Sequence, residues 1–434
     1  MRPAVDARAT ADIRPGGGGR EGEGREGTTV TIGFIPLLDC AILVAAAEKG
    51  FAEAEGLALA LVRETSWANI RDRVALGHFD AAHMLAPLPI ASTLGAGGHI
   101  NAPMIAPFSL GLGGNAITLS EPLFAELEAE GATLADGPAA MAEGLAALVA
   151  RRRHSGAAPL TLAMVHPFSG HNYELRYWLA AAGIDPDEDV RLVVLPPPFM
   201  VDALAEGQVD GFCVGEPWNS LAVARGVGAI VTTKSALWRQ GPDKVLGLRR
   251  RYAEEHPDRL AALLRALHRA AAWAGDPGNH EALARLLATP AYLGGSAETL
   301  LRALGGRIVR RHGQARDFVP DFLVLHDHAA NFPWQSHALW FYSQMVRWRQ
   351  IRFDPADAET ARMVYRPDLY RAALGPLGAD LPNASAKVEG ALRHPTPVAS
   401  RSGRMILGPD GFFDGRLFDP DDLEGYLLGL GVPV

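Results

Sequence analysis

Three features of the 434-residue chain predict an α/β protein with two lobes. Its length exceeds the size at which a single hydrophobic core keeps growing, so more than one compact unit is expected. Short apolar runs alternate with helical stretches, which is the order of a mostly parallel sheet covered by helices. One supersecondary motif also occurs twice, which indicates two similar α/β halves.

The first lobe is expected to begin at Thr29, where TVTIGFIP predicts a buried strand. A turn over residues 37–39 leads into a helix of small residues over 41–56. LALALVRE over 57–64 then predicts a second strand. This strand-helix-strand order implies neighbouring parallel strands.

The repeated motif is VALGHFDAAHM over 74–84 and ALAEGQVDGFCV over 203–214. Each copy contains the end of a helix, a glycine, an aspartate and a buried strand. The glycines fit the position just after a helix, and the aspartates fit the turn before the strand. These residues are Gly77 and Asp80 in the first copy and Gly207 and Asp210 in the second.

The second lobe is expected over residues 116–224, with strands at TLAMVHP and RLVVLPPP and a helix at GHNYELRYWLAAAG. The strand AIVTT, after Asn219, is expected to return to the first lobe. Residues 29–115 and 225–434 then form lobe 1, and the last 75 residues or so are expected to wrap it. Such an out-and-back crossing produces hinge-linked lobes with a cleft between them, where small ligands commonly bind.

Composition excludes several classes of partner. A net charge of −8 argues against direct binding of nucleic acid or an anionic membrane, since both require a basic face. Cys40 and Cys213 lie far apart without metal-ligand spacing, so no disulfide framework or metal site is predicted. Residues 1–28 are rich in Gly, Arg and Glu and lack an apolar segment, which predicts a disordered tail and a cytoplasmic protein without a membrane span.

Two polar side chains of the first lobe are candidate ligands. Trp67, in SWANIRD, follows a strand and begins a helix, so its indole N–H can point into the cleft. A tryptophan of the core or hinge is the alternative. Asn115 follows the glycine-rich stretch LGLGG, where its amide can reach the cleft. A plain interlobe linker is the alternative for these glycines, which do not form a nucleotide-binding loop.

Two residues of the second lobe are further candidates. His171 precedes the NYELRYW helix, and a helix N-terminus offers free N–H donors to an anion. A capping or surface histidine is equally compatible with the pattern. Gly215 ends the strand of the second repeat and permits close approach to a backbone N–H. The adjacent Glu216 is interpreted as a hinge carboxylate rather than a metal ligand or base.

Lys244, in GPDKVLGL, is the fifth candidate, because one ammonium group would compensate a monovalent oxyanion. A surface lysine is the alternative. No nucleophile with its base, phosphate loop, zinc motif or pair of catalytic carboxylates is recognisable, which favours a binding protein over an enzyme and implies no cofactor.

Long stretches resemble the nitrate- and bicarbonate-binding proteins of cyanobacterial-type transporters and their soluble sensor relatives. The matching text includes GFIPLLDCAILVAAAEKGFAEAEGL, SWANIRDRVALGHFDAAHMLAP, GLGGNAITLS, GHNYELRYWLAAAGI, DGFCVGEPWN and NFPWQSHALWFYSQMVRW. The resemblance runs from about Thr29 to the C-terminus. It implies a two-lobed periplasmic-binding-protein type II fold with a C-clamp shape and an extended C-terminal region.

By motif, the resemblance implies that nitrate or nitrite contacts four residues, and Asn115 as a fifth. Lys244 favours these anions over bicarbonate, because the bicarbonate-binding relatives lack that cation and use calcium. No metal is therefore expected. The four residues are Trp67, His171, Gly215 and Lys244.

The N-terminal residues differ from those of the transporter members, which resemble secreted lipoproteins. This difference favours the cytoplasmic nitrate/nitrite sensors of the NasS type, whose partner is an ANTAR-domain, response-regulator-like antiterminator of the NasT type. The binding component of a nitrate ABC transporter is one alternative. An enzyme similar to pyrimidine-precursor synthases is another, disfavoured because that class is rich in cysteine and histidine.

Overall fold

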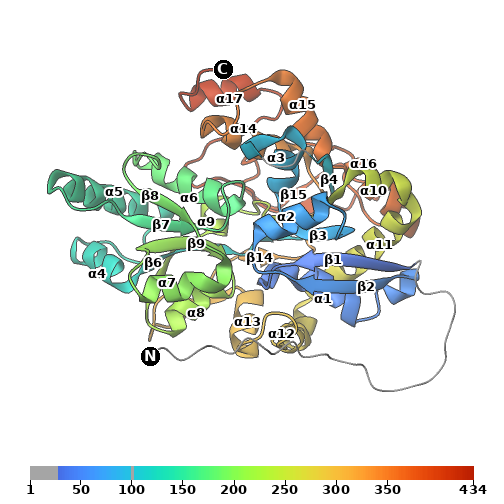
Figure 1. Cartoon of the computed structure of the whole chain (residues 1–434), viewed down its shortest axis with the longest axis horizontal. Coiled ribbons are helices and arrows are strands. Elements are labelled where there is room, and N and C mark those ends of the chain that lie inside the picture. The colour runs from blue at the N-terminus through green and yellow to red at the C-terminus, as the bar shows by residue number, and fades with distance from the viewer. Residues whose placement is uncertain (1–27, 99–101) are drawn as a thin grey trace, which may run out of the picture.

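The computed structural model describes residues 28–98 and 102–434, so the tail expected over 1–28 lies outside the described residues apart from Thr28. Two five-stranded sheets form the centres of two lobes, which lie side by side in Figure 1. The two-lobed α/β prediction is confirmed. No helix in the described ranges has the length and apolar character that crossing a membrane requires.

The first sheet has the order β2-β1-β3-β11-β4, with β1, β2 and β3 parallel and β11 antiparallel to both β3 and β4. Its apolar strands are followed by helices that begin after polar or proline residues. The strands are β1 (Thr29–Phe34), β2 (Ala58–Arg63), β3 (Ala81–Leu85), β4 (Met104–Ser109) and β11 (Lys244–Arg249), and the helices are α1 (Ala41–Glu48), α2 (Trp67–Ala75) and α3 (Leu88–Leu94).

The helix expected over 41–56 is shorter than predicted. It ends at Glu48, and Gly50 adopts a φ of +76°. A short 3-10 turn over Glu53–Glu55 follows before Gly56, whose φ is +74°. Left-handed residues end a helix, so the two glycines outweigh the helix-forming alanines around them.

The second sheet has the order β10-β6-β9-β7-β8. Its β7, β9 and β8 are parallel neighbours, and β6 runs antiparallel to β9, so the arrangement repeats that of the first sheet. The strands are β6 (Asn115–Ser120), β7 (Thr161–Met164), β8 (Arg191–Val194), β9 (Gly211–Gly215) and β10 (Gly228–Thr233), and the helices are α4 (Glu121–Ala129), α5 (Pro138–His154), α6 (Gly170–Ala181), α7 (Met200–Ala205), α8 (Trp218–Ala224) and α9 (Lys234–Leu237).

The strand AIVTT does not return to the first lobe, as the sequence led us to expect. It forms most of β10, which pairs antiparallel with β6 in the second sheet and is buried along its length. An apolar strand can pair with either sheet, and here β10 covers the edge of β6 that would otherwise be open. The chain returns to the first sheet only at β11.

The repeated motif has the same structure in both lobes. Gly77 and Gly207 have φ angles of +83° and +68° just beyond α2 and α7. One carboxylate oxygen of Asp80 accepts a hydrogen bond from the Thr31 N–H at 2.9 Å, and Asp210 accepts from the Thr161 N–H at 2.7 Å. Each aspartate therefore fixes the neighbouring parallel strand, β1 or β7, against the strand that follows the motif.

Two crossings connect the lobes, one over residues 110–114 and one over 238–243. They are hydrogen-bonded to each other: the Gly113 N–H donates to the Gly241 carbonyl at 3.0 Å, and the Leu110 N–H to the Lys244 carbonyl at 2.9 Å. The crossings end at the first residues of β6 and β11. They form the natural hinge between the lobes.

The remaining chain consists of helices and short strands joined by long loops and extends the first lobe (Figure 1). It also reaches the second lobe, since the Tyr177 ring of α6 lies 5.9 Å from the Phe412 ring and its hydroxyl donates to Asp414 at 2.9 Å. Its elements are α10 (Arg250–Glu255), α11 (Pro257–Gly275), α12 (His280–Leu287), α13 (Ala297–Leu304), β12 (Arg307–Val309), β13 (Arg316–Phe318), β14 (Leu323–Val324), α14 (Gln335–Arg347), α15 (Pro355–Val364), α16 (Pro367–Leu374) and α17 (Leu423–Gly429).

Candidate functional site

The five candidate residues lie at the ends of elements that face the junction between the lobes. Trp67 is the first residue of α2, where Ser66 caps the helix by accepting from the Ala68 N–H at 3.2 Å. His171 is the second residue of α6, which Ser169 caps by accepting from the Asn172 N–H at 3.0 Å. These caps fix where the two helices begin, and hence where both rings lie.

The other three candidates are strand residues. Asn115 begins β6 and is the register partner of Gly215, the last residue of β9. Lys244 begins β11, on the first sheet. A side-chain carbon at position 215 would lie 3.3 Å from the Asn115 amide oxygen, so glycine keeps this part of the site open.

The structure brings the five residues into one buried cluster. The Lys244 ammonium lies 5.4 Å from the centre of the Trp67 ring, a cation–π distance. His171 comes within reach through Asp243, the neighbour of Lys244, because its Nε2 lies 4.0 Å from Asp243 Oδ2. The alternative interpretation of His171 and Lys244 as surface residues is wrong, since their side chains are 0% exposed.

Sequence reasoning missed two carboxylates that flank the lysine. Asp39 lies just beyond the carboxyl end of β1, 2.9 Å from the Lys244 Nζ, and Asp243 forms a second ion pair with the same ammonium. Asp39 also lies 2.8 Å from the Nε2 of His83 on β3. The signal that was available is its place in the turn over 37–39, which follows the first predicted strand.

A second buried ion pair lies on the other side of His171. The Lys234 ammonium of α9 contacts the Glu174 carboxylate of α6, and the Asn115 amide lies 3.3 Å from that carboxylate. Glu174 is three residues after His171, so both project from the same face of α6. The sequence could have indicated this pair through that spacing.

The ionisation states follow from burial and these partners. Burial opposes ionisation of Asp39 and Asp243, but Lys244 acts with His83 on Asp39, and with His171 and Lys234 on Asp243. Together these groups outweigh burial and hold the pKa of each carboxyl below its usual range. Burial also disfavours the Lys244 ammonium, yet the two carboxylates raise its pKa above the ordinary value. For His171, burial prevails and lowers the pKa to about 3, so the imidazole is neutral near pH 7.

Several buried polar atoms of the cluster lack a hydrogen-bond partner among the described residues. They are the indole Nε1 of Trp67, both ring nitrogens of His171, Oδ1 of Asn115 and Oδ1 of Asp243. Buried polar groups are nearly always satisfied, so a concentration of unsatisfied ones indicates a place for a bound polar group. Indole, imidazole and ammonium donors around one glycine-lined space suit a small oxyanion.

The sequence matches the model of a known family over residues 23–288, more than half of the chain. The chain belongs to the NMT1-like family. Within it, the chain is 34% identical to the nitrate/nitrite binding protein NrtA of Synechococcus elongatus over 423 residues, which cover 94% of this chain and 87% of that protein.

Other relatives of this NMT1-like chain are longer. It is 37% identical to the nitrate import ATP-binding protein NrtC of Synechocystis, covering 94% of this chain but 56% of that protein. It is 35% identical to the bicarbonate transport ATP-binding protein CmpC of Synechocystis, covering 55% of it. The chain therefore spans about half the length of these two relatives.

The fold agrees with the family assignment. The crystal structure of the periplasmic nitrate-binding protein NrtA from Synechocystis PCC 6803 superimposes with a TM-score of 0.80, at 28% identity, over 93% of this chain and 98% of that one. The periplasmic-binding-protein-like architecture implied by the sequence resemblance is thereby confirmed.

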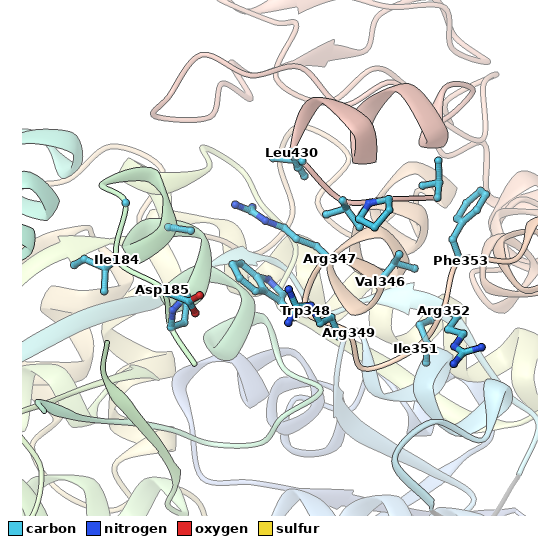
Figure 2. Close-up of a pocket in the computed structure, with 17 residues that line it drawn as sticks. Ile184, Asp185, Val346, Arg347, Trp348, Arg349, Ile351, Arg352, Phe353 and Leu430 are labelled. Carbon is cyan, nitrogen blue, oxygen red and sulfur yellow. The ribbon is translucent and has the colours of Figure 1, made fainter. Parts of the chain in front are cut away.

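The NMT1-like chain also has a cavity of about 850 Å³ away from the cluster (Figure 2). It lies between the C-terminal end of α6, the segment after α14 and the last residues of the chain. Arg347 and Trp348 line it together with Asp185. The cluster lies at the opposite end of α6, so this cavity is not the candidate site.

No group of three or more metal-ligating side chains with suitable geometry is found within residues 28–98 and 102–434. Cys40 and Cys213 are both buried, and burial raises the pKa of each thiol well above its ordinary value. The neutral thiol is a poor nucleophile and a poor metal ligand. The two cysteines therefore act as small core residues.

Proposed function

We propose that the chain binds nitrate or nitrite in the buried cluster and closes its lobes around the anion. The observation that carries the proposal is the meeting of Lys244 and Trp67 from the first lobe with His171 and Gly215 from the second. Donors from both lobes are satisfied together only when the lobes are closed, so the anion would favour the closed state. The names of the NrtA and NrtC relatives support nitrate as the ligand.

The site suits a small monovalent oxyanion better than a large ligand. Its hydrogen-bond donors act only over short distances, and Gly215 leaves room for an oxygen atom rather than for a bulky group. The N-terminus of α6 adds partial positive charge where His171 projects. Such a site binds and releases its ligand without chemical change, which is the behaviour of a binding protein.

The finer part of the proposal is a sensor role in the cytoplasm. The anion-closed form would have a lower affinity for an ANTAR-domain antiterminator of nitrate assimilation than the open form. Linkage then requires the antiterminator to weaken nitrate binding by the same factor. Titrating nitrate into the chain with and without this partner tests the coupling, and an unchanged affinity would contradict it.

A transport role is the second candidate, because the relatives NrtC and CmpC are named as ATP-binding proteins of nitrate import and bicarbonate transport. In that case the chain would deliver its anion to a membrane permease rather than release an antiterminator. Bicarbonate is the rival ligand that the CmpC similarity suggests. Mapping the mature N-terminus of the native protein, and finding export or lipid attachment, would favour transport over sensing.

The ligand proposal is tested by isothermal titration of the full chain with nitrate, nitrite and bicarbonate, the last with and without calcium. We expect nitrate or nitrite to bind, and Lys244→Met to weaken binding by about 100-fold or more, because a charged hydrogen bond is lost inside a site that keeps its carboxylates. Lys49→Met is the matched control, since Lys49 also lies over a tryptophan ring but is exposed. Binding of bicarbonate alone would overturn the nitrate assignment.

A further inference from the structure

The candidate site contains more carboxylates than ammonium groups. Three carboxylates and two lysines lie in the cluster, and every one of these residues is at most 5% exposed. The carboxylates are Asp39, Glu174 and Asp243, and the lysines are Lys234 and Lys244. An anion that enters this site adds negative charge to a buried group of charges that is already balanced or negative.

Neither ammonium group is free to compensate the anion. Lys244 contacts both Asp39 and Asp243, and Lys234 contacts Glu174. Burial raises the pKa of Glu174 above its ordinary value in spite of Lys234. If Glu174 is protonated, the carboxylates and ammonium groups are equal in number, and the anion still leaves one uncompensated charge. Burying such a charge is strongly unfavourable.

His171 is the group that can offset this charge without rearrangement. Both of its ring nitrogens lack a partner among the described residues, and its Nε2 lies 4.0 Å from Asp243. At this distance a protonated imidazole would form an ion pair with Asp243 on its Nε2 side and could donate a hydrogen bond to the anion from Nδ1.

The other titratable groups around His171 do not have this freedom. Both ring nitrogens of His83, on β3, are occupied, since Nδ1 accepts from the Ile35 N–H at 3.4 Å and Nε2 lies 2.8 Å from Asp39. The Cys213 thiol of β9 stays neutral because burial raises its pKa. The Tyr365 hydroxyl donates to the Ala86 carbonyl at 3.0 Å, and burial raises its pKa as well. Trp67 of α2 and Asn115 of β6 do not titrate near pH 7.

We propose that Asp243 makes anion binding proton-linked, so that nitrate enters together with one proton, which the His171 imidazole holds between Asp243 and the anion. This inference rests on the proposed function. The proton comes from solvent, the only bond that forms is the second N–H of the imidazole, and the added positive charge restores the charge that the site had before binding. Asp243 is thus a positioning residue that acts through His171.

The linkage predicts a measurable proton uptake. Titrating nitrate into the full chain at one pH, in buffers of different ionisation enthalpy, should show uptake approaching one proton per anion near pH 6. The affinity should fall by up to tenfold for each unit of pH increase between 6 and 8. Nitrate binding with no proton uptake at any pH in this range would overturn the inference and leave the proposed function intact.

Two variants separate the linkage from loss of binding. Asp243→Asn removes the charge that favours the imidazolium, so proton uptake should fall below half that of the unmodified chain. His171→Asn keeps an N–H donor but cannot be protonated, so its nitrate affinity should not depend on pH. Full uptake in both variants would contradict the assignment.

Asp187→Asn is the control for the removal of a carboxylate. Asp187 is exposed and pairs with Arg176 on the surface, so this change should leave the uptake unaltered. A chain that binds no nitrate at any pH, in the unmodified form and in all variants, would contradict the proposed function and the linkage together.

Discussion

A lysine that is 1% exposed needs an electrostatic reason to remain charged, and Lys244 finds it in Asp39 and Asp243. The ammonium can be buried at this position because the two neighbouring carboxylates offset the free-energy cost of burying its charge. The same carboxylates make the site poor in net positive charge. In the proposed complex, affinity for the anion would therefore depend on Trp67 and on the protonated His171 as much as on the lysine.

Glu216 is the residue for which the structure predicts a pH effect on stability. It is 1% exposed, its Oε2 accepts from the Ser220 N–H at 3.1 Å, and burial raises its pKa to about 7. The native state thus binds a proton that the unfolded state releases above its ordinary pKa of 4.5. The stability contributed by this proton is complete below pH 4.5 and is lost as the pH rises through 7.

Between pH 5 and pH 8, we therefore expect the free energy of unfolding of the Glu216→Gln variant to fall less than that of the unmodified chain. The difference should be on the order of 2 kcal/mol. Urea unfolding without ligand at several pH values measures this difference. Glu206→Gln serves as the control, because Glu206 is exposed on the same lobe. Parallel pH profiles for all three proteins would contradict the assignment.

At the scale of the element, the repeated motif holds each sheet together by the same device. Asp80 accepts a hydrogen bond from a backbone N–H of β1, and Asp210 accepts one from a backbone N–H of β7. Both strands otherwise pair with parallel neighbours. A short polar side chain thereby supplies a hydrogen-bond acceptor at the start of a ladder, where the backbone pattern is incomplete. The two aspartates should be equivalent in energetic terms.

We expect Asp80→Ala and Asp210→Ala each to reduce the free energy of unfolding by roughly 1–2 kcal/mol, because a partly buried N–H loses its acceptor. Chemical denaturation of the two variants measures this. Asp136→Ala is a matched control, since Asp136 accepts the Thr133 N–H at 2.7 Å in an exposed turn, and its loss should cost less. Equal losses at all three positions would show that the motif has no special role.

Sequence patterns predicted most elements correctly because strand and helix periodicity is local. They placed the glycines and aspartates of the repeat, whose roles depend on a few neighbouring residues. They failed for β10, because an apolar strand does not specify which of two sheets it joins. They also missed Asp39 as a member of the site, because its contact with Lys244 arises only when β1 and β11 lie in one sheet. Asp243 was missed although it directly precedes Lys244 in the sequence.

At the scale of the whole molecule, contacts other than the two crossings also hold the lobes together. The hairpin of β12 and β13 reaches from the helical extension to the second lobe. The Arg310 guanidinium donates to the carbonyls of Leu134, Ile230 and Val231, and the Ile230 N–H donates to the Arg310 carbonyl at 2.8 Å. This contact ties the helical extension to the second lobe in the arrangement that the structure shows.

We expect Arg310→Ala to shift the ligand-free chain toward an open arrangement and to weaken nitrate binding by about 3- to 10-fold, because the contact made in the closed state is lost. Small-angle X-ray scattering measures the first effect as a larger radius of gyration, and titration measures the second. Arg307→Ala, on the same hairpin but exposed, is the control. An unchanged radius of gyration and affinity would show that the hairpin does not bias closure.

The two hydrogen-bonded crossings, over 110–114 and 238–243, form the pivot about which one lobe would rotate relative to the other. Asn115 and Lys244 sit beside this pivot, where any rotation moves them least. Displacement grows in proportion to distance from the pivot, so the outer edges of the lobes, at β2 and β8, travel furthest. If the chain closes on an anion as proposed, a partner bound to both outer edges would therefore sense the closure without contacting the anion.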